Sequence, residues 1–165
     1  MCGIVGIYLK TKKFENNLGK MLSGMLNNME SRGPDSAGFA IYKNSDRKEY
    51  KYSLCINNLD FSKFKKNISQ KIKNLKLNQY SDHVILKTTE KPKKFINLIN
   101  KEFPEISIVG YGHSIEIFKQ VGNPKDVVKK FNLESFSGTH GIGHTRMATE
   151  SAITTDGSHP YSTGE

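Results

Sequence analysis

The first third of the chain carries apolar residues at two spacings, one typical of strands and the other of amphipathic helices. Residues 4–9, 38–42 and 50–56 are rich in β-branched, aliphatic and aromatic side chains, which predicts three strands. Between the first two strands, apolar residues recur three and four apart and stop before Gly33-Pro34, which predicts one amphipathic helix. The order strand, helix, loop, strand, strand favours an α+β sandwich. The core face of this helix is expected to consist of Phe14, Leu18, Met21, Leu22, Met25, Leu26 and Met29.

The middle of the chain is rich in lysine and asparagine and predicts a mixture of short elements. Apolar residues at helical spacing run from Phe61 to Leu75, and Pro92 opens a second helix. We interpret residues 1–165 as part of a single domain in which residues 57–135 form a basic insertion. The remaining predictions are strands at 84–86, 106–109 and 115–118, a turn at Gly110-Tyr111-Gly112, and a helix with Asn123 as N-cap and Pro124 as first residue.

The formal net charge is +9, and much of the excess lies between Lys63 and Lys101. Nucleic-acid-binding proteins often have such a balance. No recognised DNA- or RNA-binding motif accompanies it, so solvated surface lysines are the favoured interpretation, and a basic nucleic-acid-binding module is kept as an alternative. No apolar run approaches the roughly 20 residues of a membrane span, and no basic-then-apolar leader opens the chain. We therefore expect a cytoplasmic protein without a membrane partner.

The two cysteines have different expected roles, and two do not make a disulfide framework. Cys55 lies in an alternating stretch and is interpreted as a buried strand residue. Cys2 is small enough for the preceding Met1 to be trimmed, which would leave a thiol and a free α-amine on one residue. Such a residue can supply both a nucleophile and a general base. The alternative is a cysteine that is merely buried at the start of a strand.

Two later blocks accompany Cys2-Gly3-Ile4-Val5-Gly6-Ile7. They are Arg32-Gly33-Pro34-Asp35-Ser36-Ala37-Gly38 and Gly141-Ile142-Gly143-His144-Thr145-Arg146-Met147-Ala148-Thr149-Glu150-Ser151. In this order, the three blocks resemble the class II glutamine amidotransferases, and most of all stand-alone subunits akin to the glutamine domain of glutamate synthase. The resemblance implies an N-terminal-nucleophile hydrolase fold, a sandwich of two antiparallel sheets between helical layers. It also implies hydrolysis of L-glutamine to glutamate and delivery of ammonia to a synthase partner.

The resemblance assigns roles to individual residues. Cys2 matches the nucleophile, and Arg146 matches the arginine that binds the α-carboxylate of glutamine, a geometry that suits a guanidinium because it donates two parallel hydrogen bonds. Thr149 falls at a second substrate-binding position. No cofactor is expected in this chain, because the flavin and iron–sulfur cluster of a glutamate-synthase-like partner would belong to that partner. No metal site is expected either, since no cysteine pair accompanies His140 and His144. The supporting loop consists of Arg32, Gly33 and Asp35.

The chain ends at Glu165 within an expected loop, and the family's oxyanion-hole Asn-Gly pair does not occur in these residues. A missing oxyanion donor can lower the rate roughly 10²–10³-fold. The expectation is therefore a C-terminally incomplete domain, with sheet edges and apolar faces left uncovered. A non-catalytic glutamine-binding or assembly subunit is a second reading. An amidase that acts on another amide is a third, although Arg146 favours a free amino acid.

Overall fold

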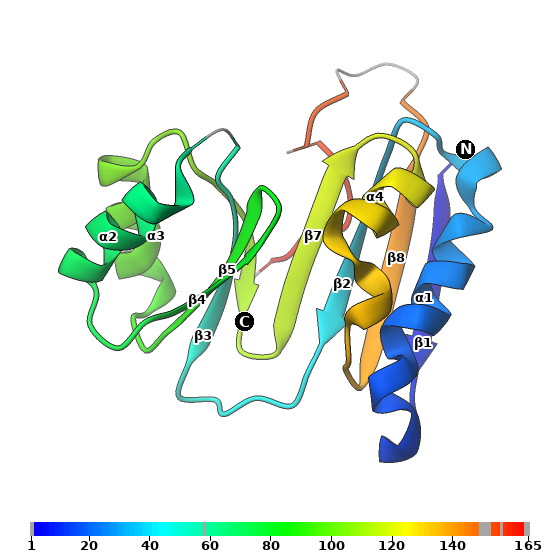
Figure 1. Cartoon of the computed structure of the whole chain (residues 1–165), viewed down its shortest axis with the longest axis horizontal. Coiled ribbons are helices and arrows are strands. Elements are labelled where there is room, and N and C mark those ends of the chain that lie inside the picture. Colours follow the sequence, from blue (N-terminus) through cyan, green and yellow to red (C-terminus); the bar gives the residue numbers. More distant parts are fainter. Residues whose placement is uncertain (1, 58, 149–152, 156, 164–165) are drawn as a thin grey trace. The chain divides into compact units, whose positions relative to one another are not determined.

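A computed structural model describes residues 2–57, 59–148, 153–155 and 157–163. Within them the chain forms two antiparallel four-stranded sheets and four α-helices (Figure 1), which confirms the α+β class expected of an N-terminal-nucleophile hydrolase. The chain divides into two compact units, and each has a sheet and helices of its own. Unit 1 comprises residues 1–44 and 117–161, and unit 2 comprises residues 45–116 and 162–165.

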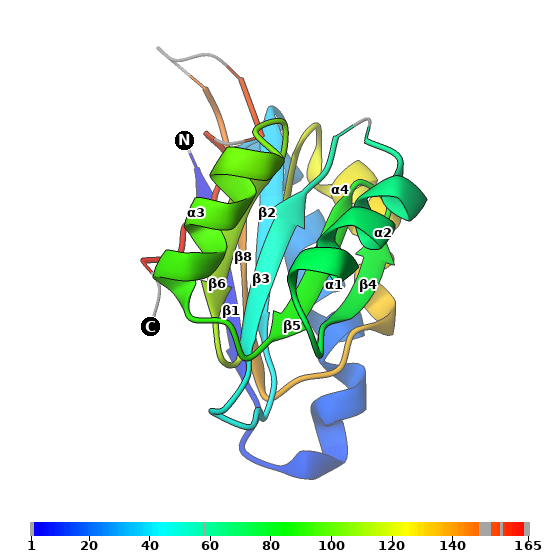
Figure 2. The same cartoon turned by 90° about the vertical axis from the view of Figure 1, so that its left-hand side faces the viewer.

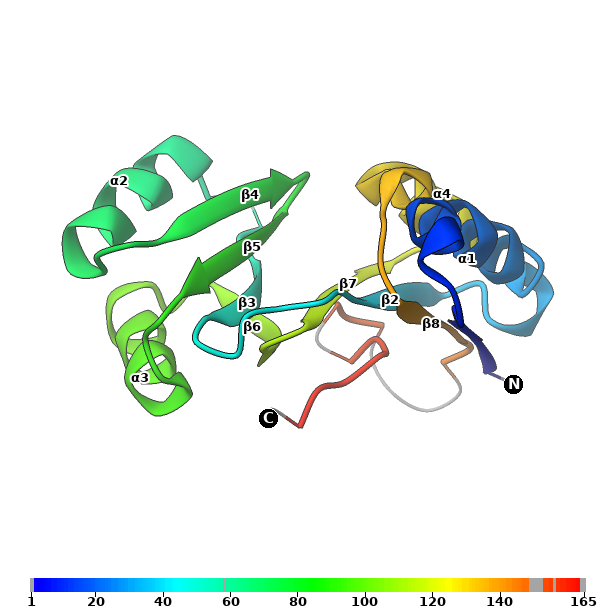
Figure 3. The ribbon, with the colours of Figure 1, turned by 90° about the horizontal axis from the view of Figure 1, so that it is seen from below.

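Unit 1 is a sheet with its two helices on one face. The strand order is β1-β8-β2-β7, so β1 is an edge strand and β8 lies between β1 and β2. Seen from below, α1 and α4 lie on the same face, and residues 157–161 lie on the opposite face (Figure 3). The elements are β1 (Gly3–Tyr8), α1 (Leu18–Asn27), β2 (Ser36–Tyr42), β7 (Ile115–Val121), α4 (Pro124–Phe131) and β8 (His140–Arg146), and the first two residues of β7 belong to unit 2.

Helix α1 is shorter than its apolar pattern predicts. The region that contains the predicted span from Phe14 to Met29 consists of a 3₁₀ helix (Lys12–Asn17), α1 itself and a second 3₁₀ turn (Glu30–Arg32). The expected methionine core face is also partly wrong. Three leucines of α1 are fully buried, whereas Met21 and Met25 are only half-buried and Phe14 is 45% exposed. Branched leucines thus fill the space above the sheet, and the unbranched methionines border it.

An aromatic cluster holds the other helix of unit 1 to its sheet. Phe39 of β2 stacks on Phe118 of β7 at 5.1 Å between ring centroids, and Phe131 of α4 contacts Phe39 edge-on at 6.1 Å. Such pairs add about 0.5–1.5 kcal/mol to the burial of their area. The predicted N-cap of α4 is confirmed, because the Asn123 side chain accepts a hydrogen bond from the Asp126 N–H at 3.0 Å.

Unit 2 repeats this plan with a second sheet, of strand order β4-β5-β3-β6. Helices α2 and α3 pack on one face of it (Figure 2), and the stacked rings of Tyr52 and Phe95, 3.8 Å apart, join α3 to β3. The Asp60 side chain caps α2 by accepting from Ser62 N and Lys63 N. The elements are β3 (Tyr50–Cys55), α2 (Phe61–Lys71), β4 (Lys76–Tyr80), β5 (His83–Thr88), α3 (Pro92–Glu102) and β6 (Ser107–Gly112).

Two sequence predictions for unit 2 are wrong. The helix expected to reach Leu75 ends at Lys71, and the edge strand β4 follows it. The turn expected at Gly110–Gly112 is part of β6, because Gly110 and Gly112 pair with Ser53 and Lys51 of β3. Among the described residues, no helix is long and apolar enough to cross a membrane.

Candidate functional site

The outer face of the unit 1 sheet brings the first and third sequence blocks together. The inner face is identified by the pair Val5 and Gly143 of β1 and β8, because a β-carbon on Gly143 would lie 3.0 Å from Leu26 of α1. Successive side chains of a strand alternate between faces, so Ile4 and His144, the next pair along, lie on the outer face. Two more outer positions of β1 and β8 expose apolar side chains, Tyr8 at 71% and Ile142 at 37%.

Cys2 and Arg146 lie at the same end of β1 and β8. The β1–β8 ladder ends with the pair Gly3 and Thr145, Cys2 is the residue before Gly3, and Arg146 is the residue after Thr145. On the other side of β8, Arg146 is the partner of Ser36, the first residue of β2. Cys2 is exposed, and this geometry brings a thiol, a guanidinium and a hydroxyl to one end of one sheet face.

Arg146 is half-buried and is oriented by a segment from the end of the chain. Its Nη1 donates to the carbonyl oxygen of Gly157 at 2.8 Å. A guanidinium has five N–H donors, so this bond uses one of them and aligns the group along the outer face.

The loop of the second sequence block supports the strand end that carries Arg146. The Asp35 N–H donates to the Arg146 carbonyl at 3.2 Å, and the Asp35 carboxylate accepts from Ala148 N–H at 2.7 Å. Gly33 touches the same backbone so closely that a β-carbon there would lie 2.6 Å from both N and C of Arg146. Arg32, which precedes Gly33, is exposed. The carboxylate of Asp35 thus caps a backbone amide.

Residues 157–161 pack against the outer face of the sheet beside Arg146. The backbone of His159 passes so close to β2 that a β-carbon on Gly38 would lie 2.2 Å from its carbonyl oxygen. Lys119 of β7, only 3% exposed, anchors the segment by donating to the Ser158 carbonyl at 3.0 Å. The Lys119 ammonium also lies 4.6 Å from the centroid of the Tyr161 ring.

His144 and His159 form a pair of neutral imidazoles next to Arg146. Their ring centroids are 4.2 Å apart, and the Nδ1 atom of each is buried without a hydrogen-bond partner among the described residues. Burial, helped by the positive charges of His159 and Arg146, lowers the pKa of His144 to about 4. Burial, Arg146 and Lys119 likewise lower the pKa of His159. At neutral pH the positive charge beside Cys2 is therefore that of the guanidinium and not of the histidines.

The sequence predicted part of this site and missed part of it. Cys2, Arg146 and Asp35 lie together as described, whereas Thr149 lies outside the described residues. Nothing in the sequence pointed to the hydrogen bond of Lys119 with the Ser158 carbonyl, because the two residues are far apart in the chain. The contact of His159 with His144 joins two segments in the folded chain and has no local signal in the sequence.

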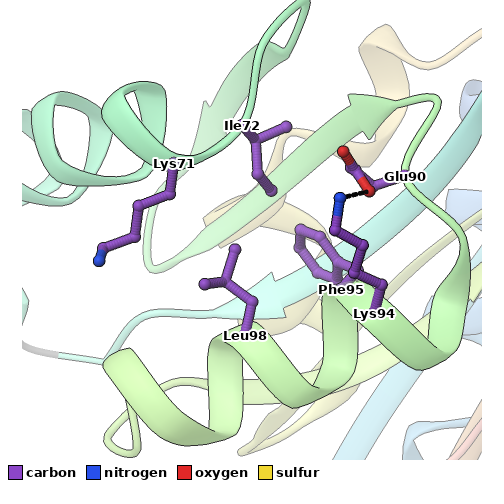
Figure 4. A pocket seen from close by; sticks show the side chains of 6 residues that line it. All are labelled: Lys71, Ile72, Glu90, Lys94, Phe95 and Leu98. Carbon is purple, nitrogen blue, oxygen red and sulfur yellow. Dashed lines mark ion pairs between the residues drawn. The ribbon is translucent and has the colours of Figure 1, made fainter.

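A pocket of about 150 Å³ in unit 2 contains none of the predicted site residues (Figure 4). Its two lysines are engaged in ion pairs, since Lys94 is 2.9 Å from Glu90 and Lys71 is 2.9 Å from Glu102. Apolar side chains of Ile72, Phe95 and Leu98 form the remaining walls. Because the charged side chains that line this pocket are in ion pairs and its other walls are apolar, the pocket gives no indication of a catalytic site.

Comparisons with known proteins bear on the identity of the chain. It is 42% identical over 167 residues to the glutamine amidotransferase-like protein GlxB of Rhizobium meliloti (strain 1021), which covers 99% of this chain and 56% of the relative. It is 30% identical over 174 residues to a putative glutamine amidotransferase of Methanothermobacter thermautotrophicus, which covers 98% of this chain and 56% of the relative. A glutamine–fructose-6-phosphate aminotransferase of Methanococcus maripaludis matches 29% of this chain at 42% identity.

No family model matches the chain. It spans a little over half the length of the two relatives that it matches from end to end, 56% in each case. Those two matches cover almost all of it, the N-terminal cysteine block and the Arg146 block included. This chain is therefore a homologue of glutamine amidotransferase-like proteins over nearly its whole length, which confirms the resemblance to glutamine amidotransferases.

Proposed function

We propose that this chain is the N-terminal part of a class II glutamine amidotransferase subunit, in which Cys2 becomes the first residue and the nucleophile after Met1 is removed. The proposal extends the homology to glutamine amidotransferase-like proteins into a specific mechanism. One observation carries it, namely the pairing of β1 with β8, whose last pair, Gly3 and Thr145, directly adjoins exposed Cys2 and Arg146. Hydrolysis of a small amino-acid amide requires that the nucleophile and the group that binds the α-carboxylate are held in fixed positions, and one rigid sheet provides this.

In the proposed reaction, the Cys2 thiolate attacks the side-chain carbonyl carbon of L-glutamine. The C–N bond then breaks, ammonia leaves with a proton that the Cys2 α-amine has carried, and a glutamyl thioester remains. Water hydrolyses the thioester to glutamate and regenerates the thiol. Arg146 binds the α-carboxylate of the substrate through its guanidinium, whose Nη1 also donates to the Gly157 carbonyl. Neutral His144 lines this face without adding a second cation.

Selective labelling tests the nucleophile. The full-length protein is incubated with a diazoketone analogue of glutamine and then mapped by peptide mass spectrometry. We expect one adduct on Cys2, in a peptide that lacks Met1, and protection by L-glutamine. Cys55 is an internal control, because it is 2% exposed and should be modified only after denaturation. Retention of Met1, or normal ammonia release by the Cys2→Ala variant, would refute the mechanism.

Steady-state kinetics test the clamp. Arg146→Lys keeps the charge but loses the paired donors, so KM for glutamine should rise more than tenfold while kcat changes less. Arg47→Lys is the matched control, since Arg47 is exposed in unit 2, and it should leave both constants unchanged. If glutamine binds and protects Cys2 but no ammonia is released by the full-length protein, the chain belongs to a glutamine-binding subunit.

We further propose that the ammonia is passed to a synthase subunit, which by the sequence resemblance would hold the flavin and the iron–sulfur cluster. The complex is purified from the cells that produce it, and synthesis is measured with glutamine and with ammonium salts. In the Cys2→Ser complex, glutamine-dependent synthesis should disappear while ammonium-dependent synthesis persists. Equal loss of both activities would contradict a role confined to ammonia supply.

A further inference from the structure

Three side chains in unit 2 form a cluster that the proposed reaction does not use. Cys55 ends β3, His83 begins β5, and the two are partners in the β3–β5 ladder, so their side chains lie side by side on one face of the sheet. Asp82 precedes His83 in the turn from β4. One possible ligand atom from each of the three residues lies within 4.8 Å of the others.

The donor set of this cluster matches one class of metal ion. A thiolate sulfur, an imidazole nitrogen and a carboxylate oxygen are all ligands of Zn²⁺, whereas Mg²⁺ and Ca²⁺ prefer sites made of oxygen alone. The charges also balance, because a thiolate and a carboxylate neutralise a dication. In a chain of net charge +9, such a pair of anionic donors is a selective place for a divalent cation.

The distances require only a small contraction. Zinc lies about 2.3 Å from sulfur and about 2.0–2.2 Å from nitrogen and oxygen, so tetrahedral ligands are roughly 3.3–3.6 Å apart. Asp82 Oδ1 and His83 Nδ1 are already 3.0 Å apart. The site closes if the sulfur moves inward by about 1 Å. Rotation of the cysteine side chain can supply this movement.

The surface side of the cluster offers an entry path. His83 is fully buried and Cys55 nearly so, but the Asp82 side chain is 21% exposed and the neighbouring Asn57 is exposed. The Cys55 thiol donates to Asn57 Oδ1 at 3.2 Å, so the sulfur already faces that side. In the metal-free chain, this bond and the Asp82–His83 contact hold the three groups near one another.

We propose that Cys55, Asp82 and His83 bind a zinc ion, with a water molecule as fourth ligand on the side of Asn57. The ion joins the end of β3 to the β4–β5 turn, which are otherwise linked at this point by the Ile56 N–H to Asp82 carbonyl hydrogen bond of 2.8 Å. The expected effect of the ion is to hold the end of β3 and the β4–β5 turn together. This site is separate from Cys2 and does not depend on the function proposed above.

Cobalt substitution tests the site, with Co²⁺ as the spectroscopic probe. The full-length protein carries Cys2→Ser, because an N-terminal cysteine is itself a nitrogen–sulfur chelate and would otherwise compete. We expect one Co²⁺ per chain at the site, with a thiolate-to-cobalt charge-transfer band, the visible bands of tetrahedral cobalt, and displacement by Zn²⁺. Absence of the charge-transfer band in this background overturns the proposal.

Ligand variants in the same background assign the band. Cys55→Ser should abolish it, and persistence of the band overturns the proposal. Asp82→Asn should weaken Co²⁺ binding at least tenfold, whereas Asp46→Asn, a matched loss of charge at an exposed turn of unit 2, should leave it unchanged. Equal affinities of these two variants overturn the proposal. If Cys55→Ser does not fold, the thermal unfolding midpoint of the Cys2→Ser protein decides in its place. Zn²⁺ should raise this midpoint, and should raise it less in the Cys2→Ser, Asp82→Asn protein, whereas no shift with Zn²⁺ overturns the proposal.

Discussion

A methyl group added at Gly33 probes the support of Arg146 directly. The Gly33 backbone is extended, with φ −168°, so alanine meets no conformational penalty there. The added carbon would instead lie 2.6 Å from backbone atoms of Arg146, where ordinary contacts begin at 3.4 Å. Because both partners are backbone, the end of β8 or the loop must move by nearly 1 Å. Such overpacking costs about 1–3 kcal/mol of unfolding free energy.

Gly24 provides the matched control for this substitution. It lies inside α1, and a β-carbon there would have no neighbour within 4 Å. Gly24→Ala should therefore stabilise the protein by about 0.5–1 kcal/mol through helix propensity. Urea denaturation followed by circular dichroism should separate the two variants by about 1.5–4 kcal/mol, with unchanged slopes. Hydrogen exchange should also quicken at Thr145 and Arg146 in Gly33→Ala alone. Equal stabilities would refute the close contact between the loop and β8.

Three further results are expected. Asp35→Ala removes the acceptor of the Ala148 N–H and should lower the unfolding free energy by about 1.5–3 kcal/mol in urea titrations. Asp60→Ala should cost about 1 kcal/mol by loss of the α2 cap, whereas Asp60→Asn should be nearly neutral, and equal losses would contradict a capping role. Because His144 has a pKa of about 4 when folded and 6.5 when unfolded, its contribution is complete above pH 6.5 and is lost as pH falls toward 4. The slope is at most about 1.4 kcal/mol per pH unit and should be shallower in His144→Gln, so identical pH profiles would refute the burial of this imidazole.

Local signals predicted the elements that local interactions decide. The α4 start was found because Asn123 and Pro124 act within one turn of the helix that they begin. Strand β4 was missed because its five residues are mostly polar or exposed, as expected of an edge strand, and carry no alternating pattern of their own. Gly110 and Gly112 resemble turn residues in isolation, and only their pairing with β3 makes them part of a strand.

The candidate site was predicted as residue types and not as an arrangement. Cys2, Arg146 and the Asp35 loop stand out in the sequence because each belongs to a compact motif. Lys119 belongs to none of these motifs, and the motif that contains His144 did not indicate its contact. Their positions here depend on Ser158 and His159, which approach them only in the folded chain. The Cys55, Asp82 and His83 cluster was missed for the same reason, because a single cysteine far from its partners in sequence reads as core.

The sequence by itself determined the class of the fold, the family resemblance and the identity of the chemical groups, because periodicity, caps and motif composition act over a few neighbouring residues. Tertiary structure alone decided the register of β8 between β1 and β2, and with it the pairing of Arg146 with Ser36 and its position at the same strand end as Cys2. It also decided which histidines are neutral, since their pKa values depend on burial and on charges brought from distant segments. The physical reason is that strand pairing and desolvation join residues far apart in the chain, and no local pattern encodes which strand will be the neighbour.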